Sequence, residues 1–176
     1  MISRMGFLAA AASVCMSSAV YGQDLKPVPR PASADEDHAI VFELGAAPSW
    51  EHAERAIHTG GTFAFEVTPI EHWLELEIGV TATPADGGVE MPFDVLFKKP
   101  WQFSPRFEFM LGAGPEIVHA SGGSGATFWG WEGVLDFMFW PKKNVGWYVE
   151  PSYEITFRAG MEHHGVGVAI GLLIGR

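Results

Sequence analysis

The stretch at 74–80 reads Leu74-Glu75-Leu76-Glu77-Ile78-Gly79-Val80, in which bulky apolar residues alternate with carboxylates and a glycine. A period of two is that of a β-strand, because successive side chains of a strand point to opposite faces of the sheet. The same period continues from Ala39 almost to the end of the chain, and a helical period of 3.6 is suggested in one loop only. The sequence therefore predicts an all-β fold.

Eight strands can be separated at clusters of turn-forming residues. They are expected at 39–48, 62–70, 74–83, 89–98, 106–120, 126–140, 145–158 and 165–175. An even number of strands joined by short turns can close into an antiparallel up-and-down barrel, which leaves no open sheet edge.

The two faces of these strands differ sharply in composition. One face is apolar and bulky, as in Phe63, Phe65, Leu76, Ile78, Phe93, Phe97, Phe107, Phe109, Trp131, Phe137, Trp147, Tyr153, Val168, Ile170 and Leu172. The other face carries glycines and the carboxylates of Glu43, Glu66, Glu75, Glu77, Glu90, Asp94, Glu108, Glu116, Glu132, Asp136, Glu150 and Glu154.

Alternation alone leaves two barrels open. A soluble periplasmic lipocalin-like binding protein would hold the aromatic residues inside, whereas a membrane barrel would turn them toward lipid. An eight-stranded barrel is too narrow to hold so many Phe and Trp side chains. In addition, Trp73, Trp101, Trp140 and Trp147 fall near one set of strand ends, as in an interfacial aromatic belt. We therefore expect an eight-stranded antiparallel up-and-down transmembrane β-barrel.

The N-terminal segment is typical of an exported protein. Arg4 precedes an apolar run and then small residues as far as Gly22, which predicts a cleaved signal peptide at 1–22 that contains the one cysteine, Cys15. A segment rich in Pro and acidic residues follows, so we expect a disordered periplasmic tail at 23–38 and the barrel domain at 39–176. The formal net charge of −10 argues against nucleic acid as a partner.

The alternation also orients the barrel. With the tail in the periplasm, the turns at 71–73, 99–105 and 141–144 are periplasmic, and the loops at 49–61, 84–88, 121–125 and 159–164 face outside. The loop at 49–61 is long enough for a helical turn, with Ser49 as N-cap and Gly60-Gly61 as its end.

In these features the chain resembles the small bacterial outer-membrane β-barrels, the eight-stranded opacity-like and OmpX-like proteins. The resemblance covers 39–176 and includes the strand Phe107-Glu108-Phe109-Met110-Leu111-Gly112-Ala113-Gly114 and the closing strand 165–174. It implies residence in the bacterial outer membrane, contact with outer-membrane lipids and lipopolysaccharide, and insertion by the outer-membrane assembly machinery. One departure is the end of the chain at Gly175-Arg176, where members of the family usually end on an aromatic residue.

The acidic face is the most unusual feature of the sequence. About a dozen carboxylates inside a barrel need water, protons or cations around them, and Lys98, Arg106 and Arg158 are the basic residues near that face. We expect a non-catalytic barrel without a cofactor, structural or surface-exposed in its role, whose acidic lumen interacts with cations. A divalent metal site is a further possibility, formed at the outer ends by His52, Glu54, His58, His163 and His164.

An enzyme is the alternative from a different class. Lipid A 3-O-deacylases of the outer membrane use a His and a Ser two positions apart on a late strand, together with a Glu. His119 and Ser121 have that spacing and Glu132 is a candidate acid, although the family places its pair on a later strand than this chain does.

Overall fold

The computed structural model describes residues 40–52, 56–85, 87–122 and 125–175. The predicted signal peptide and tail therefore lie outside the described residues, as do Glu54 and Arg176. The described part contains eight strands: β1 (Ile40–Glu51), β2 (Ala56–Ile70), β3 (Leu74–Ala85), β4 (Gly88–Ser104), β5 (Phe107–Ser121), β6 (Ala126–Lys142), β7 (Val145–Arg158) and β8 (Met161–Gly175).

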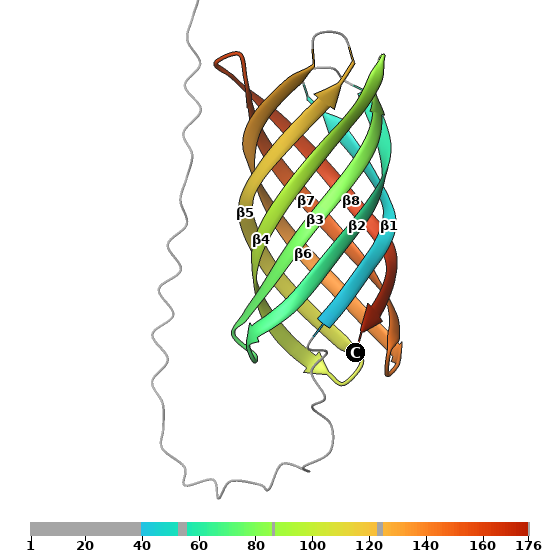
Figure 1. Ribbon diagram of the computed structural model, residues 1–176. Helices are drawn as coiled ribbons and strands as arrows, with labels where there is room; N and C mark the ends of the chain where they lie inside the picture. The colour runs from blue at the N-terminus through green and yellow to red at the C-terminus, as the bar shows by residue number, and fades with distance from the viewer. Residues whose placement is uncertain (1–39, 53–55, 86, 123–124, 176) are drawn as a thin grey trace, which may run out of the picture. The chain divides into compact units, whose positions relative to one another are not determined.

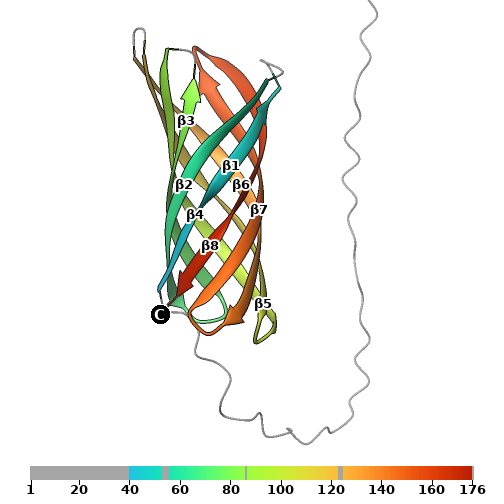
Figure 2. The same ribbon diagram turned by 90° about the vertical axis from the view of Figure 1, so that its right-hand side faces the viewer.

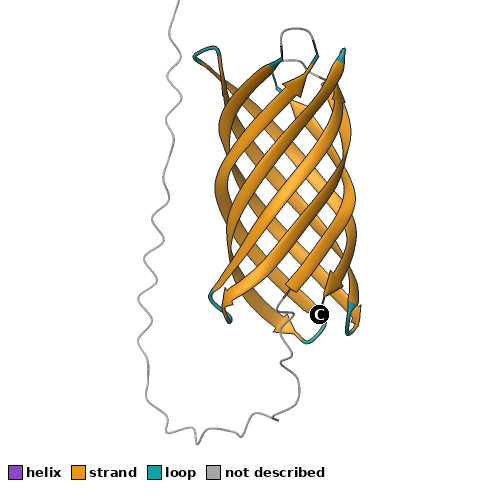
Figure 3. Cartoon of the chain, viewed as in Figure 1, coloured by secondary structure: helices purple, strands orange, loops and turns teal. Residues whose placement is uncertain are grey.

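Each strand pairs antiparallel with its neighbours in the sequence, and β1 also pairs with β8, so the sheet closes into a barrel (Figures 1 and 2). Closure gives every strand a partner on both sides, which is how a sheet satisfies its backbone polar groups in lipid. The expected up-and-down topology is confirmed, and the elements drawn in Figure 3 are strands joined by short turns. Within the described ranges no helix is long and apolar enough to cross a membrane.

The barrel has two ends with different connections. Val41 pairs with Gly175, so β1 begins where β8 finishes, and we call this the terminal end (Figure 1). The turns between β2 and β3, β4 and β5, and β6 and β7 lie there as well. The opposite end, the distal end, carries the other four connections, including the two-residue turn Ala159–Gly160, in which both residues have positive φ as in a type I′ hairpin.

The alternation predicted from sequence turns the apolar face outward. Side chains such as Phe42, Leu44, Phe63, Ile78 and Phe97 are exposed, at 41–61% of their maximum. A lipocalin-like barrel would hold these side chains inside, so that alternative is wrong for this chain. Large apolar side chains all around a closed barrel form a surface suited to lipid.

An aromatic belt surrounds part of the terminal end. Phe103 stacks on Phe107, Phe107 packs against Phe139, and Phe139 stacks on Trp147 with 4.1 Å between the ring centroids. Trp73, Trp101 and Trp147 are exposed as expected of interfacial residues, at 60%, 40% and 44%. The inclusion of Trp140 in this belt was wrong. Trp140 lies an even number of positions from Asp136 and Met138 on β6, so it has the same parity and shares their face of the strand. Its side chain points into the lumen and is 6% exposed.

The predicted helical turn in the first distal loop was also wrong. Strand β1 continues to Glu51 and β2 begins at Ala56, and their pairing continues through Ser49 with His58 and Trp50 with Ile57. Ser49 is therefore a strand residue and not an N-cap. Similarly, β4 extends to Ser104, which reduces the predicted turn at 99–105 to Pro105 and Arg106.

Candidate functional site

The lumen is sealed toward the terminal end by large apolar side chains. This plug is formed by Val41, Met110, Met138, Trp140, Tyr148 and Leu173, all of them buried. Tyr148 lies over two glycines of neighbouring strands: a Cβ atom on Gly45 would be 2.8 Å from the Tyr148 hydroxyl, and one on Gly171 would be 2.7 Å from its ring. The absence of side chains at these two positions makes room for the tyrosine.

An ion cluster lies above the plug, with Lys98 at its centre. The fully buried Lys98 Nζ donates hydrogen bonds to Glu150 Oε2 at 2.6 Å and to Asp136 Oδ2 at 3.1 Å. It also forms ion pairs with Glu77 and, at 3.7 Å, with Glu66. The stem of Lys98 runs across Gly112, where a Cβ atom would lie 2.6 Å from the lysine Cγ.

This cluster holds more negative than positive charge. Oxygen atoms of Glu43, Glu66, Glu77 and Asp136 lie within 4.8 Å of one another, and the Lys98 ammonium is the cation paired with three of these residues. Removing two opposite charges from water costs several kcal/mol per ion, which only close and well-bonded partners offset. Lys98 therefore occupies the position that a metal ion would need at this point in the barrel.

A cavity of about 490 Å³ extends from the ion cluster to the distal rim. Glu43, Glu77 and Tyr148 line its floor, and Ser121 and His163 line it near the rim. Many residues of its wall have small side chains or none, such as Ala47, Ala64, Thr81 and Gly167. Because these side chains do not fill the lumen, a cavity remains here, whereas large side chains fill the terminal end.

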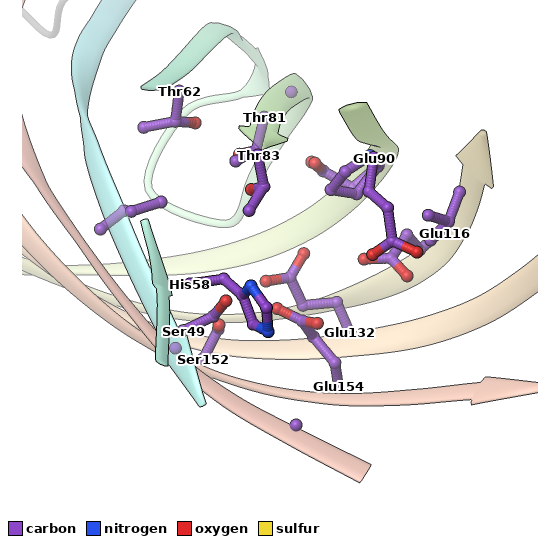
Figure 4. A pocket seen from close by; sticks show the side chains of 18 of the residues that line it. Ser49, His58, Thr62, Thr81, Thr83, Glu90, Glu116, Glu132, Ser152 and Glu154 are labelled. Carbon is purple, nitrogen blue, oxygen red and sulfur yellow. The ribbon is translucent and has the colours of Figure 1, made fainter. Parts of the chain in front are cut away.

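The cavity is strongly acidic. Nine carboxylates line it, and Arg158 is the one Lys or Arg among the described residues of its wall. Arg158 pairs with Glu90 at 3.0 Å and lies over the Phe128 ring. Figure 4 shows the carboxylates of Glu90, Glu116, Glu132 and Glu154 and the His58 ring directed into the cavity.

Two of these carboxylates are deeply buried and carry an oxygen atom with neither a hydrogen bond nor an ion pair. Glu116 is 2% exposed and its Oε1 accepts no hydrogen bond; Glu43 is 1% exposed and the same holds for its Oε1. Buried polar atoms in proteins are normally hydrogen-bonded. Both residues line the cavity, so both unsatisfied atoms lie beside space that a ligand or water can enter.

The structure separates the histidines proposed for a metal site. His163 Nδ1 lies 3.2 Å from Glu51 Oε1, whereas His164 Nδ1 lies 2.8 Å from the Tyr153 hydroxyl on the outer surface. His52 packs edge-on against Trp50, and His58 points into the cavity. Among the described residues, the one set of three or more His, Cys, Asp or Glu ligand atoms that converge is the mid-barrel set around Lys98.

The residues proposed for hydrolysis also lie apart. His119 is on the outer surface, with Nδ1 3.1 Å from the Thr127 hydroxyl. Ser121 exchanges hydrogen bonds with the backbone of Val89. Glu132 points into the cavity, on the opposite face of the sheet from His119. These three side chains do not form a catalytic triad in this structure.

The twelve acidic-face residues fall into three groups along the lumen. Eight line the cavity: Glu43, Glu77, Glu90, Asp94, Glu116, Glu132, Glu150 and Glu154. Glu66, Glu75 and Asp136 are buried beneath it, and Glu108 shares the strand face of Met110 near the terminal end. The plug was not predicted from the sequence, although Met110, Met138, Tyr148 and Leu173 lie on the same inward face of their strands as the carboxylates.

A closed eight-stranded antiparallel barrel with an apolar exterior, an aromatic belt and a polar lumen is the architecture of the small outer-membrane β-barrels. Among solved structures the chain is similar to neisserial surface protein A, with a TM-score of 0.62 and 12% identity over 78% of this chain and 96% of that one. It is also similar to the outer membrane protein OprG from Pseudomonas aeruginosa, with a TM-score of 0.58 and 10% identity over 77% and 94%. No protein-family model and no curated protein matches the sequence. The likeness establishes the fold, and the expected resemblance to eight-stranded outer-membrane barrels is confirmed.

Proposed function

We propose that this chain is a non-catalytic protein of the bacterial outer membrane whose acidic lumen takes up cations at the outer surface and does not conduct them. Its exterior contacts outer-membrane lipids and lipopolysaccharide, and the distal end faces outside. The observation that carries this proposal is a cavity lined by nine carboxylates that ends on the ion cluster and the plug.

The charge balance supports cation binding over a purely structural role. A purely structural lumen of this width can be filled by large side chains, as the terminal half is. The distal half keeps a cavity and an excess of carboxylates instead, which destabilises the fold unless counter-charges enter. A cation that binds only the folded barrel then stabilises it by mass action.

Two measurements test the proposal together. In planar bilayers the purified barrel is expected to give no steady current, because the plug closes the lumen. In thermal unfolding, the midpoint should rise with added sodium, magnesium or amine salts, and the rise should shrink when Glu90, Glu116 and Glu154 are replaced by Gln. A midpoint that responds to none of these cations, or responds equally in the triple variant, would show that the cavity does not take them up.

A further inference from the structure

The kind of cation can be inferred from the spacing of the unsatisfied carboxylates. Glu43 belongs to the mid-barrel cluster at the floor of the cavity. Glu116 lies nearer the distal rim, five residues before the end of β5 and opposite Asp94 of β4. A ligand that satisfies both Glu43 and Glu116 must therefore present positive charge at two separate depths.

A single metal ion does not meet this requirement. In the part of the chain that the structure describes, carboxylate oxygens converge tightly enough to share one ion only around Lys98, whose ammonium group is already there. The carboxylates of the cavity wall are spread over several strands and do not form such a set. One ion could contact one or two of them and would leave the others unpaired.

Lys98 itself shows which kind of group the lumen accepts. Its side chain is a primary ammonium on an unbranched aliphatic stem, and this group enters the carboxylate cluster fully buried. An ammonium offers three donors, which match several carboxylate oxygens at once. The cavity continues this environment toward the rim, with carboxylates set among small apolar and hydroxyl-bearing side chains such as Ala47, Ala64, Thr81 and Ser152.

We propose that the cavity binds linear aliphatic polyamines, with one terminal ammonium directed at Glu43 and the following ammonium groups at Glu116, Glu132 and Glu154. The methylene segments of the ligand lie along the small apolar residues of the wall, and the hydroxyl groups accept the remaining N–H donors. This inference rests on the proposed uptake of cations by the same cavity, and it specifies their class. A slender chain suits an elongated cavity of about 490 Å³ better than a compact organic cation does.

The experiment is calorimetric titration of the refolded full barrel in detergent micelles with spermidine. Butylamine, which has one ammonium, and magnesium chloride serve as comparison ligands. We expect saturable binding of spermidine, much weaker binding of butylamine, and competition by magnesium only at high concentration. Equal, weak binding of spermidine and butylamine would overturn the proposal without any variant.

The test variant combines Glu116→Gln with Glu154→Gln. The matched control is Glu71→Gln, because Glu71 is exposed in the terminal turn between β2 and β3, away from the cavity. The double variant should weaken spermidine binding about tenfold or more, because charge-assisted hydrogen bonds are the strong ones. The control should leave it unchanged. A gel shift between boiled and unboiled samples verifies that each variant is folded.

The outcomes separate this inference from the proposed function. If magnesium or sodium binds saturably and spermidine does not compete, the polyamine assignment fails while cation uptake stands. If no cation gives saturable heat, both fail. If spermidine binds equally well to the wild type and to the double variant, binding takes place outside the cavity and the assignment also fails.

Discussion

The terminal and distal halves of the lumen are built from the same eight strands with the same alternation, yet one half is filled and the other is hollow. In the terminal half the inward side chains are large, as in Met110, Met138, Trp140 and Tyr148. In the distal half many inward positions carry Ala, Gly, Ser or Thr between carboxylates. The comparison shows that parity decides which face a residue occupies, while the size of the inward residues along the axis decides whether the barrel is closed or open.

The ion pairs of the two halves differ in the same way. Lys98 is completely buried between several carboxylates at the boundary with the plug. Arg158 and Glu90 form a single pair near the distal rim, and their side chains are about a quarter exposed, at 27% and 26%. Charges that water reaches interact more weakly than charges from which it is excluded. The following variants test this difference.

The largest effect is expected for Lys98→Met. Removing one partner of a buried ionic group leaves the others uncompensated, which typically destabilises a protein by about 3–5 kcal/mol. The measurement is the free energy of unfolding by denaturant of the barrel in lipid vesicles. Lys142→Met, at an exposed position on β6, is the matched control and should change stability by no more than about 0.5 kcal/mol. Equal stability of the two variants would show that the cluster does not depend on its ammonium.

A smaller effect is expected where the plug meets the sheet. In Gly171→Ala the new Cβ would lie closest to the backbone carbonyl oxygen of Leu44 and 2.7 Å from both the Gly45 Cα and the Tyr148 ring, so the filled half has no space for it. Overpacking of this kind costs about 1–3 kcal/mol. The same assay applies, and a neutral result would mean that the β1 backbone at Leu44 and Gly45 and the Tyr148 ring can all move away, so that the sheet and the plug are loose here.

Gly61→Ala on β2 is the control for this substitution. No atom lies within 4 Å of the Cβ that it would add. Replacing a glycine within a strand removes backbone freedom from the unfolded chain, so the variant should be neutral or more stable by up to about 1 kcal/mol. Opposite signs for the two Gly→Ala variants are therefore the expected result.

The sequence was sufficient to predict the barrel because its information is local. The alternation in residues such as Leu76, Glu77 and Ile78 assigns each side chain to a face without knowledge of its neighbours. The helical turn predicted after Ser49 failed because pairing with β2 continues past it, and a strand partner outweighs a weak capping pattern. Trp140 was misplaced because its nearness to a strand end was given more weight than its parity.

The lumen could be predicted only in part because its contacts cross between strands that do not pair. Lys98 on β4 reaches Glu150 on β7 and Asp136 on β6, and neither strand is a neighbour of β4 in the sheet. Such contacts depend on strand register and tilt around the whole barrel, which one sequence does not specify. The acidic face could therefore be recognised from sequence, but the central lysine, the plug and the cavity required the structure.

The smallest effect is expected for Glu90→Gln at the distal rim. The variant removes the carboxylate that pairs with Arg158, but the guanidinium remains over the Phe128 ring, 4.0 Å from its centroid, and stays accessible to water. Exposed or partly exposed pairs contribute about 1 kcal/mol or less, so the change in unfolding free energy should lie below that. Because the variant also removes one of nine like charges from the cavity, part of even this loss is offset. A cost as large as that of Lys98→Met would mean that water is excluded from the distal half as it is from the terminal half, and the distinction between the two halves would fail.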